Sequence, residues 1–187
     1  MLKFSKTHDP KFPPGVCSST TKIFFNFFIF SINLLGNGFD LNKFIQEFRE
    51  EFLTLPPEEI AYPRSVNGLS KWSESHTLFK KGAPIHVKGG ILYNHLINKN
   101  KLSRYYPLIQ EGDKIKFLNI RTPNPMSSNV ISFFTKLPKE LDIHKYLDYD
   151  MQYEKAFVEP LTFIMDQIGW NIDRSYGKQT TLEDFFS

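Results

Sequence analysis

The sequence predicts an α+β fold that is mostly helical, with a few short β-strands and a flexible tail at its carboxyl end. Two stretches, residues 40–55 and 148–169, place apolar side chains at steps of three and four residues, as amphipathic helices do. Between them, short apolar runs alternate with Gly, Pro and Asn, a texture typical of strands joined by turns. With 187 residues, one domain with tails is the expected organisation.

The first predicted helix, "DLNKFIQEFREEFLTL", has clear start and stop signals. Asp40 is a favoured N-cap residue, and Pro56 and Pro57 stop the helix. Its apolar positions are Leu41, Phe44, Ile45, Phe48, Phe52 and Leu55. The second predicted helix begins near Asp148 and closes at Gly169. Its apolar positions are Tyr149, Tyr153, Phe157, Leu161, Ile164, Met165 and Ile168.

The segment between the two helices predicts short elements. "APIHV" (83–87) is expected to be a strand and "ILYNHLINK" (91–99) a short helix. "EGDKIKFLNI" (111–120) predicts a turn followed by a strand, and "NVISFF" (129–134) predicts another strand. In the first of these strands, one face would carry Ile115, Phe117 and Asn119 and the other Lys114 and Lys116.

The predicted domain organisation has three parts. Residues 1–15 are expected to form an irregular tail because they contain three prolines and a glycine. Residues 16–173 are expected to form the folded domain, and residues 174–187 a flexible tail that ends in a short motif.

Two features bear on the compartment. The Phe-rich run from Ile23 to Leu35 is too short to cross a membrane as a helix, and the prolines before it argue against a signal peptide. The single cysteine, Cys17, rules out an internal disulfide and fits a reducing compartment. The expected location is therefore the cytoplasm, with no membrane as partner.

The net charge of +3 is distributed unevenly along the chain. Residues 61–121 contain 11 Lys and Arg against 3 Asp and Glu, whereas residues 139–187 contain 5 against 10. Such a basic block indicates a face that binds a polyanion. A chance fluctuation on a solvated surface is the alternative that charge counting leaves open.

Catalytic and metal-binding patterns are weak. The sequence contains no Gly-rich phosphate loop, no nucleophile elbow and no His and Cys cluster at metal-ligand spacing. His86 and His95 give a weak metal hint. Asp142, Asp148 and Asp150 more often mark the start of a helix, where the dipole favours carboxylates. We therefore predict no catalytic residue, metal site or cofactor on this chain.

Four ordered blocks carry a resemblance to a known family. They are Pro84-Ile85-His86-Val87-Lys88-Gly89 with Tyr93-Asn94; Glu111-Gly112-Asp113-Lys114; Asp148-Tyr149 with Glu154-Lys155, Phe157 and Pro160-Leu161; and Leu182-Glu183-Asp184-Phe185. In these blocks the chain resembles the carboxyl-terminal thumb region of family B DNA polymerases, and most closely those of T-even-like tailed bacteriophages. Upstream, "SSTTK" (18–22) and "SINLL" (31–35) are similar to the first thumb helix, but residues 23–30 depart from it and residues 1–15 match nothing in it.

The resemblance implies a module that grips the primer–template duplex. In that family the two metal-binding aspartates lie in D-x-x-S-L-Y-P and Y-G-D-T-D motifs of the palm, and neither motif occurs here. The chain alone is therefore expected to be inactive as a nucleotidyltransferase, with the palm and its magnesium on another chain or lost.

Residue chemistry suggests which side chains face the DNA. Lysines and arginines contact phosphates, neutral side chains add hydrogen bonds, and a glycine pair lets backbone approach a phosphate. The predicted DNA-binding residues are Arg64, Asn67, Lys80, Lys81, His86, Lys88, Gly89, Tyr93 and Asn94. Lys71, Lys99, Lys101 and Arg104 add to the positive charge. For Tyr93, a place in the core is the alternative.

The last residues, "GKQTTLEDFFS", predict a second partner. Gln179, Leu182, Phe185 and Phe186 spell Q-x-x-L-x-x-F-F, which on one helical turn forms an apolar plug. The pattern is similar to the peptide by which replicative polymerases dock into a sliding clamp. Packing of the two phenylalanines onto the chain's own surface is the alternative.

Two further functions stay open from the sequence. The chain could be a free-standing DNA-binding or processivity accessory protein that never joins a polymerase. It could also be a non-functional polymerase remnant, since phenylalanines replace a charged helix face within residues 23–30. If the chain is encoded by a phage, the cytoplasm in question is that of the host cell.

Overall fold

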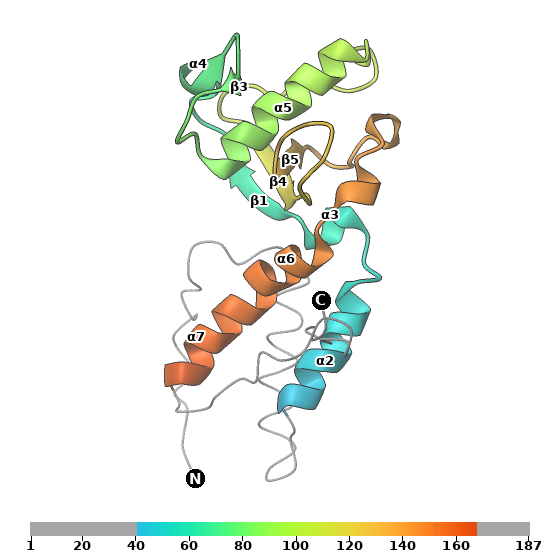
Figure 1. Ribbon diagram of the computed structural model, residues 1–187, viewed down its shortest axis with the longest axis vertical. Helices are drawn as coiled ribbons and strands as arrows, with labels where there is room; N and C mark the ends of the chain where they lie inside the picture. The colour runs from blue at the N-terminus through green and yellow to red at the C-terminus, as the bar shows by residue number, and fades with distance from the viewer. Residues whose placement is uncertain (1–40, 168–187) are drawn as a thin grey trace, which may run out of the picture.

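The computed structural model describes residues 41–167 and has the predicted α+β architecture. Figure 1 shows two levels: a small sheet with helix α5 (Ile85–Lys99) at one end, and helices α2 (Leu41–Phe52), α6 (Tyr149–Tyr153) and α7 (Glu159–Gln167) at the other. One continuous hydrophobic core joins the two levels. No helix within residues 41–167 has the length and hydrophobicity needed to cross a membrane.

Helix α2 confirms the first predicted helix, although it ends at Phe52, three residues before Leu55. Its buried side packs against the carboxyl-terminal helices through an aromatic cluster. The ring centroids of Phe48 and Phe157 lie 4.4 Å apart and those of Phe52 and Tyr153 5.2 Å apart. The Tyr153 hydroxyl also donates a 2.7 Å hydrogen bond to the Ile45 carbonyl, so this buried phenol is satisfied.

After α2 the chain turns through a short helix, α3 (Pro57–Ile60), into the sheet. The sheet is antiparallel with strand order β1 (Tyr62–Ser65), β4 (Lys114–Asn119), β5 (Val130–Phe133). Phe117 of β4 lies opposite Tyr62 on one side and Ser132 on the other. The strands expected within 111–120 and 129–134 are therefore confirmed.

Helix α5 corrects one prediction. Residues 83–87 were expected to be a strand, but Ile85 begins a 15-residue helix that runs to Lys99. Pro84 fits the position before a helix because its missing N–H would have no partner there. Of the two β-branched residues that suggested a strand, Val87 is fully buried and Ile85 is exposed, and tertiary packing of the helix overrides their intrinsic preference.

A second, two-stranded sheet lies beside α5. The short helix α4 (Leu69–Trp72) leads into β2 (Ser73–Glu74), which pairs with β3 (Leu78–Phe79). The amino end of α4 is capped at a distance, because the Glu111 carboxylate accepts hydrogen bonds from the backbone N–H groups of Gly68 (2.6 Å) and Ser70 (3.2 Å).

The second predicted helix is present with an irregularity. The helix starts near Asp148 as predicted, and Asp148 is its N-cap, accepting a 3.0 Å hydrogen bond from the Met151 N–H. Helix α6 continues through a π-helical turn, η4 (Glu154–Val158), into α7. The wide turn lies directly before Pro160, whose ring and missing N–H disturb regular helical hydrogen bonding. Residues 168 and 169 of the prediction lie outside the described residues.

Two short 3₁₀ helices, η2 (Lys139–Leu141) and η3 (His144–Tyr146), lead from β5 to α6. One buried side chain then ties α6 to the sheet level. Gln152 is 1% exposed, and its amide donates a 2.7 Å hydrogen bond to the Ile60 carbonyl. Its oxygen accepts from the Asn119 side chain at 3.0 Å. This network fixes the position of the sheet relative to the helices.

Candidate nucleic-acid interface

The basic block of residues 61–121 retains its charge in the folded protein. Of its eleven lysines and arginines, only Arg121 forms an ion pair with a carboxylate of residues 41–167. The others bond to neutral groups or to solvent: Lys80, for example, donates to the Lys71 carbonyl at 2.8 Å. Ten positive charges are therefore uncompensated within the described part of the chain, as a surface that binds an anion requires.

One group of these charges surrounds the amino end of α5. Lys88 holds its ammonium 5.6 Å from the centre of the Phe79 ring, and Lys71 lies over Trp72. Lys80 and Lys81 are exposed in the loop that precedes the helix. No side chain caps the first backbone N–H groups of α5, so the partial positive charge of the helix end adds to that of the lysines.

Arg64 and His86 border this group on the side of the sheet. Arg64 is exposed on the edge strand β1, and His86 is half-buried in the first turn of α5, with its ring 6.2 Å from that of Phe117. Burial lowers the pKa of His86, and the positive charge of Arg64 lowers it further. The lowered pKa favours the neutral imidazole, so His86 adds less positive charge to this surface than the neighbouring lysines do.

The structure separates the remaining basic residues from this group. Lys99, Lys101 and Arg104 lie at the opposite end of α5, about 22 Å away for a helix of 15 residues. Tyr105 beside them is 78% exposed. The basic block of the sequence is thus divided between surface groups at the two ends of α5 and three further residues on or just after β4, Lys114, Lys116 and Arg121.

Two predicted DNA-binding residues are buried, and that prediction is wrong for them. Gly89 packs on β5 so tightly that a Cβ atom there would lie 2.4 Å from the Ser132 hydroxyl oxygen. The absence of a side chain at Gly89 allows close packing of α5 on strand β5, and not the approach of a phosphate. Tyr93 is 2% exposed, which confirms the alternative of a core aromatic, and burial raises its pKa to about 12.

Asn94 has a different role from the one predicted. Its side-chain amide donates a hydrogen bond to the Ile109 carbonyl, and its oxygen accepts from the Ile109 N–H, both at 2.8 Å. The side chain is occupied in holding the 109–111 segment against α5. Asn67 is exposed in the loop after β1, so of the two predicted asparagines it is the one with an exposed side chain.

The weak metal hints find no support in the geometry. His86 and His95 stand nine residues apart on one helix, which places them on opposite sides of it. Asp148 caps α6, and Asp150 pairs with Arg49 at 2.6 Å. Within residues 41–167 no three His, Cys, Asp or Glu side chains come together to hold a metal ion.

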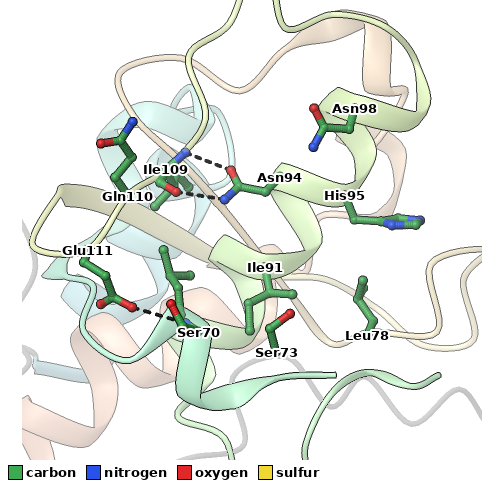
Figure 2. Close-up of a pocket in the computed structure, with 11 residues that line it drawn as sticks. Ser70, Ser73, Leu78, Ile91, Asn94, His95, Asn98, Ile109, Gln110 and Glu111 are labelled. Carbon is green, nitrogen blue, oxygen red and sulfur yellow. Dashed lines mark hydrogen bonds between the residues drawn. The ribbon is translucent and has the colours of Figure 1, made fainter. Parts of the chain in front are cut away.

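The sequence did not predict a pocket that lies next to the basic residues at the amino end of α5. It has a volume of about 470 Å³ and lies between α4, β3, α5 and residues 109–111 (Figure 2). Asn94 and Glu111 build its wall through their hydrogen bonds to backbone. Asn94 and Glu111 belong to two of the four sequence blocks that resemble family B polymerases. Their spacing in the sequence gave no sign that they would line the same pocket.

The predicted clamp-binding residues Gln179, Leu182, Phe185 and Phe186 lie outside the described residues. No protein-family model matches the chain, and a search of the curated proteins finds no relative.

Proposed function

We propose that this chain binds duplex DNA without reading its sequence, as a thumb-like part of a family B DNA polymerase. The observation that carries the proposal is the group of basic residues without carboxylate partners around the amino end of α5. Its members, named here the α5 basic group, are Arg64, Lys71, Lys80, Lys81 and Lys88. We propose no catalytic role for the chain.

The chemistry of this group suits phosphates. Lysines act as point charges that tolerate many phosphate positions, and their binding releases the counterions condensed on DNA. Contacts of this kind fix the position of a protein on the duplex and carry no sequence information. The uncapped helix end adds N–H donors of the kind that phosphate oxygens accept from.

The test is a binding titration over a salt series with a labelled primer–template duplex and a matching single strand. We expect salt-sensitive binding that prefers the duplex. The variant K80A/K81A should lower the slope of log K against log salt by about two, since each lost phosphate contact removes about one ion. The control K43A/K155A, in which both lysines pair with a carboxylate on their own helix, should keep the slope. Absence of binding at low salt would overturn the proposal.

A free-standing DNA-binding accessory protein is the second candidate function, because such a protein would use the same α5 basic group to contact DNA phosphates. Coexpression with a palm-containing polymerase chain separates the two functions. Only the thumb function predicts that the two chains form a stable complex with polymerase activity. A non-functional remnant predicts neither a complex nor DNA binding.

We also propose a sliding clamp as partner of the terminal motif, on the sequence pattern of residues 179–186 alone. Deletion of residues 179–187 should abolish clamp binding and leave both duplex binding and the melting temperature unchanged. A large fall in melting temperature would show instead that Phe185 and Phe186 belong to the core.

A further inference from the structure

The pocket in Figure 2 offers an apolar floor to a ligand. Leu69, Leu78, Ile91 and Ile109 supply it, from four different parts of the chain. Its volume of about 470 Å³ lies within the range of small-molecule sites, roughly 300–1,000 Å³. An apolar surface of this shape favours a flat ligand with apolar faces.

The polar side chains that line the pocket are of two kinds. The side chains of Asn94 and Glu111 are hydrogen-bonded to backbone groups of the pocket wall and are not available to a ligand. In contrast, Ser73, His95 and Asn98 are exposed, and their side chains have no hydrogen-bond partner among residues 41–167. In Figure 2 His95 and Asn98 project from α5, and Ser73 lies across the pocket from them. These side chains offer hydrogen-bond donors and acceptors to a ligand.

The charge of the lining narrows the class of ligand. No lysine or arginine lines the pocket, and Glu111 would repel an anion that entered it. A wholly apolar ligand would make no use of the exposed hydroxyl, imidazole and amide, whereas a ligand with a polar edge can hydrogen-bond to them. The lining therefore fits an uncharged planar heterocycle with donors and acceptors on its edge, which describes a nucleobase.

The α5 basic group places phosphates next to this pocket. Lys88 is three residues before Ile91, so the two side chains lie on the same side of α5. Lys88 also lies over Phe79, the neighbour of the pocket residue Leu78. Lys71 stands between Ser70 and Ser73 in the sequence, and both of these residues line the pocket. A nucleotide whose base entered the pocket would have its phosphate near these ammonium groups.

We propose that this pocket binds an unpaired nucleobase at the single-stranded end of a DNA duplex. The proposal rests on the proposed function, since the neighbouring basic group holds the duplex. Contact of one base with the aliphatic floor and the His95 ring, together with hydrogen bonds to its edge, should gain roughly tenfold in affinity, the low end of what stacking on an aromatic side chain contributes. A duplex with a single-stranded end should therefore bind about tenfold more tightly than a blunt duplex of the same length.

The experiment compares a blunt duplex, the same duplex with a four-nucleotide overhang, and the same overhang with abasic sites. Asn98→Ala and Ser73→Trp, the latter filling the pocket, should remove the preference for the overhang and keep blunt-duplex affinity. The control Ser75→Trp places the same bulk on the same hairpin at an exposed position that does not line the pocket.

The outcomes distinguish the two proposals. Equal affinity for all three DNAs would overturn the base pocket and leave the duplex grip standing. A preference that persists in the abasic overhang would also overturn it, since phosphates would then account for the gain. Binding to the overhang without binding to the blunt duplex would support the pocket and overturn the duplex grip. No binding to any DNA would overturn both.

Discussion

The two levels of the molecule use charged and aromatic residues in opposite ways. In the helical level, Arg49 pairs with Asp150 at 2.6 Å, and Arg121 reaches Asp150 at 3.4 Å. Phenylalanines of α2 are buried there against Tyr153 and η4. In the α5 level, lysines lie over half-buried rings without any carboxylate of residues 41–167 to pair with.

The difference separates residues that stabilise the fold from exposed cations that contribute nothing to it. Buried aromatic contacts dominate the energetics of the helical level, and its exposed ion pairs add little. Unpaired cations around α5 repel one another and stabilise nothing by themselves. The α5 level therefore carries a positive charge that no carboxylate of residues 41–167 neutralises.

The largest expected effect on stability is that of removing a ring from the aromatic cluster of the helical level. Phe48→Ala should lower the free energy of unfolding by about 3–5 kcal/mol, because the ring is 4% exposed and packs against four other aromatic rings, of which Phe157 is the nearest at 4.4 Å between centroids. Chemical denaturation measures this. Phe163→Ala is the matched control, since that ring is 62% exposed, and its loss should change stability by less than about 0.5 kcal/mol. Equal effects at the two positions would contradict the described core.

The glycine pair of α5 tests how the helix packs on the sheet. Gly89→Ala should destabilise the protein by about 1–3 kcal/mol, because its Cβ would overlap Ser132. Gly90→Ala should be neutral or stabilise by up to about 1 kcal/mol, since its Cβ meets only ordinary contacts and alanine favours the helix. If the two substitutions had the same sign, the close approach of α5 to β5 would be wrong.

The asparagines of α5 distinguish a structural amide from a free one. Asn94→Ala should cost about 1–2 kcal/mol of unfolding free energy, because it leaves the N–H and carbonyl of buried Ile109 without partners. Asn98→Ala, at an exposed position in the same helix, should change stability little. A similar loss at Asn98 would show that its amide also has a structural partner.

Substitution of one unpaired lysine and of one paired lysine should affect the salt dependence of DNA binding differently. Lys88→Ala should reduce the salt slope of duplex binding by about one ion, whereas Lys155→Ala, which removes the partner of Glu159, should leave it unchanged. The measurement is a titration at four or more salt concentrations. An unchanged slope in the Lys88 variant would remove this residue from the DNA surface.

The smallest expected effect is a dependence of stability on pH. The pKa of His86 is lower in the folded protein than in the unfolded chain, so the unfolded chain binds more protons below pH 6.5. Stability should therefore be full above pH 6.5 and fall as the pH drops towards the folded pKa. His86→Gln should flatten this part of the curve, and His76→Gln, at an exposed loop position, should not. An unchanged curve in the His86 variant would mean that the imidazole is as well solvated as in the unfolded chain.

Local patterns were sufficient for part of this structure. Side-chain periodicity and residues that start or stop elements predicted three features: the helical spacing of residues 41–52, the helix start near Asp148, and the strands within 111–120 and 129–134. Charge counting located the basic block, and the α+β class followed from the order of the elements. These features depend on neighbours close in sequence, which a sequence displays directly.

Tertiary contacts decided the rest. The helical state of residues 85–90 depends on packing against β5, and two glycines with two β-branched residues gave no local sign of it. Tyr93 is buried and Asn94 is bound to Ile109 because segments 15 or more residues away come to rest beside them. Sequence alone determined which charges this protein has, and only the folded chain decided which of them are paired, because pairing depends on distances between residues far apart along the chain.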